Sequence, residues 1–127
     1  ELKTSRQLSN PHQQASFEKH KLLKFWVQSF LAGVPRIVVG FRDDAGVVGS
    51  LQSVETMKIP RMVRGKEDMW DPAACLNFGK AVLEWLLQQM RQLPADASAV
   101  MRYEPAQGAV LLLRVEEGEG PTAKRAS

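Results

Sequence analysis

The first three residues, Glu1, Leu2 and Lys3, carry the side chains of a metal-dependent hydrolytic site. On a β-strand, residues two apart lie on the same face, so Glu1 and Lys3 would stand side by side. A glutamate can hold a divalent cation, and a neighbouring lysine can steady the attacking water or the phosphate oxygens. The triplet Glu-X-Lys is also common by chance on surface strands. Its weight therefore depends on its surroundings.

A basic face on the following helix is the second chemical feature. Lys21, Lys24 and Gln28 are spaced so that they share one helix face, roughly opposite the apolar residues Trp26 and Phe30. The lysines would supply positive charge to a phosphate backbone, and the glutamine amide would donate to a nonbridging oxygen. The same spacing also fits an ordinary solvated helix face.

The carboxylates of the chain do not supply a complete metal site. Magnesium prefers octahedral oxygen ligation and usually takes more than one protein oxygen. Asp43 and Asp44 have the composition of a turn, whereas Asp68 and Asp71 fit a loop and a helix cap. If Glu1 is a metal ligand, we expect its partner ligands to lie upstream of this chain.

The other reactive side chains give weaker indications. His12, expected in a loop, and His20, expected on a helix, lack a catalytic partner, and Cys75 fits an ordinary buried residue. Trp70 follows a basic cluster and could stack on a nucleic-acid base, although a core position is the default for tryptophan. The cluster consists of Lys58, Arg61, Arg64 and Lys66.

Two helices and several strands must position these residues. Ser16 is a plausible N-cap for a helix reaching about Ala32, with an apolar stripe at Leu23, Trp26, Val27, Phe30, Leu31 and Val34. Asp71-Pro72 predicts the N-cap and first turn of a second helix, 71–92. The remaining expected segments are a strand at 1–5, a loop at 6–14, a hairpin at 36–42 and 47–56 around a turn at 43–46, an irregular connection at 57–72, and a hairpin at 99–103 and 109–115. This order predicts an α/β fold.

Length and composition fit one domain. The chain has 127 residues, 24% of them charged and 44% hydrophobic, with a net charge of +3. The basic balance is compatible with a polyanionic partner. A single cysteine indicates a reducing compartment, and the absence of a long apolar run predicts no membrane contact. The polar first residues, without a methionine, indicate a fragment of an intracellular protein.

Several collinear segments resemble the DXO/Dom3Z family of decapping nucleases and exoribonucleases. The first are Glu1-Leu2-Lys3-Thr4-Ser5, the helical run 20–31, Gly33-Val34-Pro35 and Val39-Gly40-Phe41-Arg42. Thr56-Met57-Lys58, Trp70 with Pro72, Cys75-Leu76-Asn77-Phe78 and Tyr103-Glu104-Pro105 follow in the same order. The resemblance covers about residues 1–105.

The resemblance implies a fold, a chemistry and roles for individual residues. The family has a core like that of PD-(D/E)XK nucleases, with a mixed sheet flanked by helices, and its mainly nuclear members remove incomplete or NAD caps from RNA 5′ ends and degrade RNA from that end. They use a divalent cation, Mg²⁺ or Mn²⁺. By resemblance, Glu1 ligates the metal through its side chain and Leu2 through its backbone carbonyl. Lys3 and Gln28 contact the scissile phosphate or the attacking water, which makes Glu1, Lys3 and Gln28 the expected catalytic residues.

The chain departs from the family pattern in two ways, which change what we expect of its activity. The upstream acidic motifs and an arginine-bearing segment are absent, and residues 116–127 replace an aromatic-rich strand. We therefore expect residues 1–115 to be the C-terminal part of the nuclease domain, 116–127 to be a disordered polar tail, and this chain alone to be inactive and monomeric. The alternative is a noncatalytic RNA-binding or protein-interaction module that uses the basic helix face.

Overall fold

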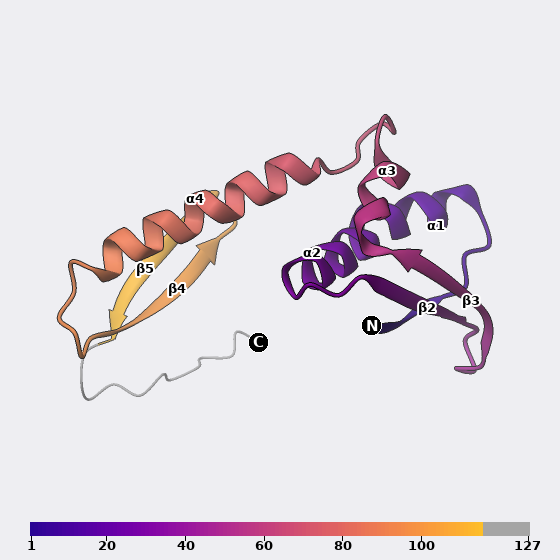
Figure 1. Cartoon of the computed structure of the whole chain (residues 1–127), viewed down its shortest axis with the longest axis horizontal. Helices are drawn as coiled ribbons and strands as arrows, with labels where there is room; N and C mark the ends of the chain where they lie inside the picture. Colours follow the sequence, from indigo (N-terminus) through magenta and orange to yellow (C-terminus); the bar gives the residue numbers. More distant parts are fainter. Residues whose placement is uncertain (116–127) are drawn as a thin grey trace. The chain divides into compact units, whose positions relative to one another are not determined.

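The computed structural model describes residues 1–115, which form two units, 1–76 and 77–115. The first contains a three-stranded sheet and its helices, and the second contains a two-stranded hairpin beside most of one long helix (Figure 1). The strands are β1 (Leu2–Arg6), β2 (Arg36–Arg42), β3 (Val48–Glu55), β4 (Ser98–Glu104) and β5 (Ala109–Val115). The helical segments are α1 (Pro11–Ser16), η1 (Phe17–Leu22), α2 (Leu23–Leu31), η2 (Thr56–Lys58), α3 (Ile59–Val63) and α4 (Pro72–Met90).

The sheet of the first unit is mixed, as expected. β1 pairs in parallel with β2, placing Lys3 opposite Val39, and β2 pairs antiparallel with β3. The β2–β3 connection is a tight turn in which the Asp43 carboxylate accepts a hydrogen bond from the Val47 backbone N–H at 2.9 Å. β2 is therefore the central strand, with β1 along one side. The predicted strand at 1–5, the strand at 36–42, the turn and the hairpin partner are confirmed.

The helical layer begins earlier than the sequence analysis predicted. Asn10, not Ser16, is the N-cap, since its side chain accepts from the Gln13 backbone N–H at 2.9 Å and Pro11 occupies the first turn. Ser16 lies inside a run that continues through the π-helical turn η1 into α2. The predicted loop at 6–14 is therefore wrong at both ends, because β1 extends to Arg6 and α1 starts at Pro11.

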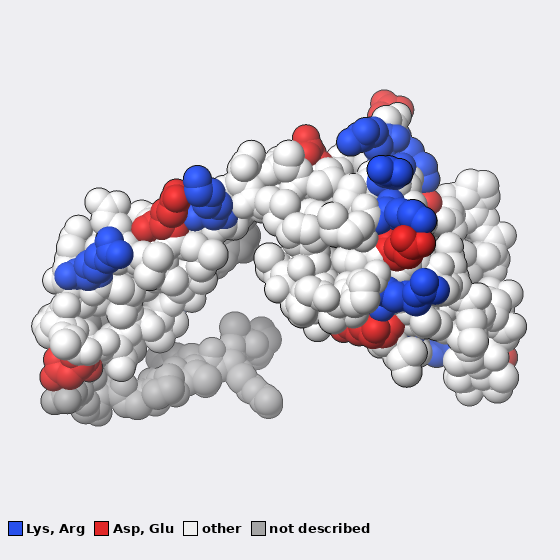
Figure 2. Space-filling model, viewed as in Figure 1, with Lys and Arg blue, Asp and Glu red and all other residues white. Residues whose placement is uncertain are grey.

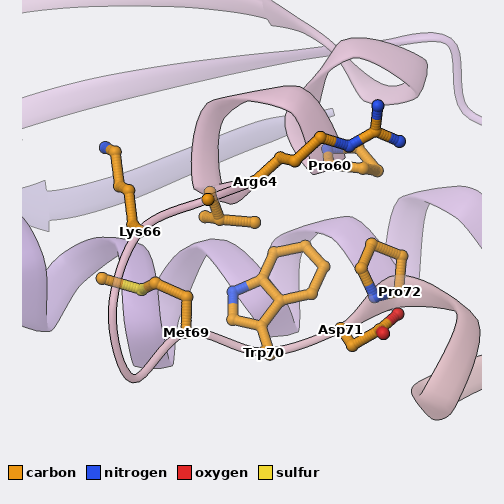
Figure 3. A pocket seen from close by; sticks show the side chains of 9 residues that line it. Pro60, Arg64, Lys66, Met69, Trp70, Asp71 and Pro72 are labelled. Carbon is orange, nitrogen blue, oxygen red and sulfur yellow. The ribbon is translucent and has the colours of Figure 1, made fainter.

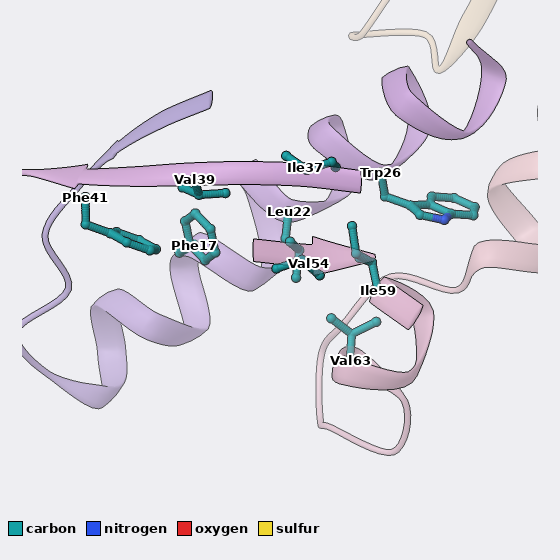
Figure 4. Close-up of a cluster of buried hydrophobic side chains, with 9 residues drawn as sticks. All are labelled: Phe17, Leu22, Trp26, Ile37, Val39, Phe41, Val54, Ile59 and Val63. Carbon is teal, nitrogen blue, oxygen red and sulfur yellow. The ribbon is translucent and has the colours of Figure 1, made fainter. Parts of the chain in front are cut away.

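The core of the first unit lies between the sheet and this helical layer (Figure 4). Its buried members are Phe17, Leu22, Trp26, Ile37, Val39, Phe41, Val54, Ile59 and Val63. Trp26 belongs to the predicted apolar stripe, and Leu23, Val27 and Phe30 pack partly buried against the core. Leu31 does not, because it lies at the end of α2 and is 72% exposed.

The segment between β3 and α4 is more regular than predicted. Residues 57–72 were expected to be irregular, but η2 and α3 occupy its first part. Ile59 and Val63, one helical turn apart, are buried in the core. A helix of five residues is too short to show a clear period in the sequence, so its anchoring comes from these two side chains.

The second helix starts as predicted. The Asp71 carboxylate accepts from the Ala73 backbone N–H at 2.7 Å and from the Ala74 N–H at 3.3 Å. In the second unit, α4 lies alongside the hairpin β4–β5, and Phe78, Trp85 and Tyr103 line a shared hollow. No helix within the described 1–115 is long and apolar enough to cross a membrane. The predicted polar tail lies outside the described residues.

Candidate nuclease site at the β1–α2 seam

The backbone of Glu1 is held in the sheet, which fixes the direction of its side chain. The Glu1 amino group donates to the Arg36 carbonyl at 2.8 Å, and the Glu1 carbonyl accepts from the Val38 N–H at 2.8 Å. Glu1 therefore continues the β1–β2 ladder. Strand alternation places its side chain on the face of Lys3 and Ser5, where the helical layer packs.

Lys3 contacts both of the other predicted catalytic residues, Glu1 and Gln28. Its Nζ lies 2.7 Å from Glu1 Oε1 and donates to Gln28 Oε1 at 2.6 Å. It also lies 5.5 Å from the centroid of the Phe25 ring, a cation–π distance. Because an ammonium only donates, Gln28 presents its oxygen to Lys3, and its amide NH₂ remains available to another acceptor. The structure brings Glu1, Lys3 and Gln28 together.

Ser29, which the sequence analysis did not single out, is also part of this group. Its side chain is fully buried in α2, and its hydroxyl donates to Glu1 Oε2. Hydrogen bonds from Lys3 and, second, from Ser29 lower the pKa of the Glu1 carboxyl. Glu1 is thus kept ionised, the state in which a carboxylate binds a cation.

Leu2 offers its backbone. Its side chain is 82% exposed and contributes nothing to the core. Because the Glu1 carbonyl points to β2, alternation directs the Leu2 carbonyl to the opposite edge of β1. Glu1 and Leu2 thus present a carboxylate and a carbonyl oxygen, both hard ligands that suit Mg²⁺ or Mn²⁺. Across residues 1–115, no group of three or more His, Cys, Asp or Glu side chains could hold a metal ion.

The predicted basic face has two kinds of residue. Lys21 extends to β1, where its Nζ donates to Ser5 Oγ at 3.1 Å, so Lys21 and Gln28 both reach the first strand. Lys24 is exposed. His12 lies on α1 rather than in a loop, and with His20 it lines a hollow of about 360 Å³ at the end of β1.

Trp70 has a structural role. Its ring stacks on Trp26 with centroids 5.1 Å apart, and its indole N–H donates to the Glu18 carbonyl at 3.0 Å. It also borders a hollow of about 300 Å³ with Arg64 and Lys66 (Figure 3). Trp70 therefore packs against the core, partly buried, which is the default that the sequence predicts for a tryptophan.

Basic side chains gather over α3 on the face shown in Figure 2, with acidic groups among them. Two members of the predicted cluster are already paired, Lys58 with Glu55 at 2.7 Å and Lys66 with Glu18. This pairing reduces the charge that the cluster can offer to phosphates.

A mixed sheet whose first strand presents Glu-X-Lys to a helix fits the class of PD-(D/E)XK-like nucleases. The family model of RAI1-like PD-(D/E)XK nucleases matches residues 1–125. The chain belongs to this family, which includes the decapping nucleases and exoribonucleases that it resembles in sequence.

Individual relatives agree with this assignment. The human decapping and exoribonuclease protein is 51% identical over 105 residues, which are 83% of this chain and 26% of that protein. The crystal structure of Candida albicans Rai1 in complex with pU5-Mn²⁺ matches with a TM-score of 0.80 and 31% identity over 91% of this chain and 32% of that one. That of Scheffersomyces stipitis Rai1 in complex with (3′-NADP)⁺ and calcium ion matches with a TM-score of 0.79 and 32% identity, over 94% and 31%. The chain thus spans about a quarter of the human relative and a third of the two crystallised chains.

Proposed function

We propose that this chain supplies the Glu-X-Lys strand and the adjoining helix of an RNA 5′-end decapping nuclease. The observation that carries the proposal is that Lys3 contacts both Glu1, at 2.7 Å, and Gln28, at 2.6 Å. These contacts lie at the β1–α2 seam, the line along which β1 packs against α2. Residues distant in sequence thereby form one polar corner with a carboxylate, an ammonium and an amide NH₂.

Each residue of this corner has a role in phosphodiester hydrolysis. Glu1 and the Leu2 carbonyl would hold the divalent cation, which supplies Lewis acidity when bound. Lys3 would orient the attacking water and offset negative charge developing on the phosphate. The Gln28 amide NH₂ would donate to a nonbridging phosphate oxygen, since its carbonyl oxygen is already bound by Lys3.

The substrate is inferred from the relatives. Candida albicans Rai1 was crystallised with pU5 and Mn²⁺, which supports a 5′-phosphorylated RNA substrate. Scheffersomyces stipitis Rai1 was crystallised with (3′-NADP)⁺, which supports NAD-capped RNA as a further substrate. We propose that this protein removes such caps and degrades the RNA that remains.

We further propose that residues 1–127 do not complete the metal site alone. Glu1 and Lys3 together carry no net charge, so a divalent cation at Glu1 would also meet a positive ammonium. Carboxylates elsewhere in a protein of its relatives' length would have to add the missing negative charge.

The decisive experiment compares this chain with the complete protein on 5′-monophosphate RNA and NAD-capped RNA with Mg²⁺ or Mn²⁺. Hydrolysis by the complete protein only is the expected result. In that protein, Lys3→Met should lower turnover by roughly 10²–10³-fold, the effect of losing one preorganised charge-stabilising donor.

The matched control is Lys80→Met. Lys80 is an exposed lysine of the second unit that pairs with Glu84 at 3.5 Å. Its substitution should leave turnover unchanged. Near-parental turnover by a folded Lys3→Met protein would contradict the proposed chemistry. RNA binding without hydrolysis by either form would favour the noncatalytic binding module.

A further inference from the structure

Ser29 is the buried polar residue closest to the proposed chemistry. It is 0% exposed, although it lies on a helix only nine residues long. Its backbone carbonyl accepts from the Val34 N–H at 2.8 Å, which ties the end of α2 to the segment entering β2. The backbone that carries its hydroxyl is therefore held by α2 and by the segment that leads into β2.

The Ser29 hydroxyl and Lys3 hold the two oxygens of Glu1 separately. Lys3 Nζ lies 2.7 Å from Oε1, whereas the Ser29 hydroxyl donates to Oε2. A glutamate has three rotatable side-chain bonds, and a single donor leaves its carboxylate free to turn about that contact. Two donors on opposite oxygens restrict that rotation.

We propose that Ser29 is a positioning residue that orients the Glu1 carboxylate for a divalent cation. The proposal rests on the proposed function, in which Glu1 is a metal ligand. Groups that hydrogen-bond to ligating carboxylates orient them, and losing one typically weakens metal binding by about 10–100-fold. Ser29 has the required location, because its hydroxyl is withdrawn from water and contacts Glu1 directly.

The test measures Mn²⁺ binding by the complete protein without RNA, using the electron paramagnetic resonance signal of free Mn²⁺. Ser29→Ala should weaken Mn²⁺ binding by about 10-fold or more. In turnover assays it should raise the Mn²⁺ concentration needed for half-maximal rate, with a smaller change at saturating Mn²⁺. Parental Mn²⁺ affinity in a folded Ser29→Ala protein would overturn the proposal.

Ser5→Ala is the matched control. Ser5 is also a buried serine of the same seam, but its hydroxyl contacts Lys21 rather than Glu1. Its loss should leave Mn²⁺ affinity within about twofold of the parent. An equal loss in both serine variants would show a general loosening of the seam and would overturn a specific role for Ser29.

A double-mutant cycle with Glu1→Gln separates this inference from the proposed function. If Ser29 acts through Glu1, Ser29→Ala should add almost nothing to the loss caused by Glu1→Gln. If Glu1→Gln leaves Mn²⁺ affinity unchanged, the proposed metal-ligand role of Glu1 fails. If Glu1→Gln weakens binding and Ser29→Ala does not, only the inference about Ser29 fails.

Ser29→Cys keeps the experiment decisive should the alanine variant fail to fold. The thiol fills the site of the hydroxyl with a slightly larger atom and is a weaker donor. Mn²⁺ affinity should fall between those of the parent and Glu1→Gln. Parental affinity in the cysteine variant would count against the proposal.

Discussion

Replacing Lys66 by methionine should destabilise the protein, because it leaves the buried carboxylate of Glu18 without its ionic partner. The Glu18 side chain is 6% exposed and pairs with Lys66, and its other oxygen accepts from Gln14 Nε2 at 2.8 Å. Removing one member of a buried ion pair costs roughly 3–5 kcal/mol. Lys66 is 46% exposed, so solvent screening lowers the expected loss to about 2 kcal/mol.

The tryptophan pair provides the assay. The Trp70 indole donates to the Glu18 carbonyl, and its ring stacks on Trp26, so the fluorescence of these two of the three tryptophans reports on this region during urea unfolding. Lys66→Met should lower the free energy of unfolding by about 2 kcal/mol, and adding Glu18→Gln should recover part of it by removing the unpaired charge.

Lys58→Met is the control, because its partner Glu55 is 50% exposed and such pairs contribute about 0–1 kcal/mol. A Lys66→Met protein no less stable than Lys58→Met would refute the reasoning from burial.

Two further predictions concern stability. Ile59→Val should cost about 0.5–1.5 kcal/mol because it removes a methylene group from a fully buried site, whereas Met57→Ala, at a position that is 70% exposed, should change the thermal midpoint little. The hydrogen bond from Lys19 lowers the pKa of Asp68 below its ordinary 3.8, so this pair stabilises the fold above that pH and loses its effect as pH falls through the lowered pKa. The difference in melting temperature between the parent and Asp68→Asn should therefore shrink on acidification, and a difference independent of pH would contradict the prediction.

Helix starts show how far local sequence signals could be used. Asp71-Pro72 correctly predicted an N-cap followed by a proline in the first turn. Asn10-Pro11 has the same pattern, a capping residue followed by proline, and the structure uses it as a helix start. The sequence analysis placed this pair in a loop. The predicted apolar stripe starts only at Leu23, so the helix start was predicted at Ser16, later than the observed Pro11. Capping chemistry was the better guide to the boundary than hydrophobic periodicity.

The π-helical turn explains why the periodicity failed locally. A π turn inserts an extra residue into the helical repeat, so positions before and after it are out of phase by one. Phe17 and Leu22 are both buried across this turn, although they are five residues apart. A pattern search with a period of 3.6 residues could not place both on one face. The end of the stripe failed for another reason, because Leu31 is the last residue of α2.

The candidate site was predictable in part, and its missing member shows what further reasoning the sequence would have allowed. Strand alternation placed Glu1 beside Lys3. Helix-face spacing singled out Gln28, and the family resemblance gave it a role at the site; its contact with Lys3 spans 25 positions. Ser29 lies three residues after Trp26, and therefore on the buried side of the helix. A hydroxyl there requires a hydrogen-bond partner. The sequence offered two kinds of acceptor, the carbonyls of the helix itself and the carboxylate of Glu1 at the start of the neighbouring strand, and the structure shows that Ser29 donates to Glu1.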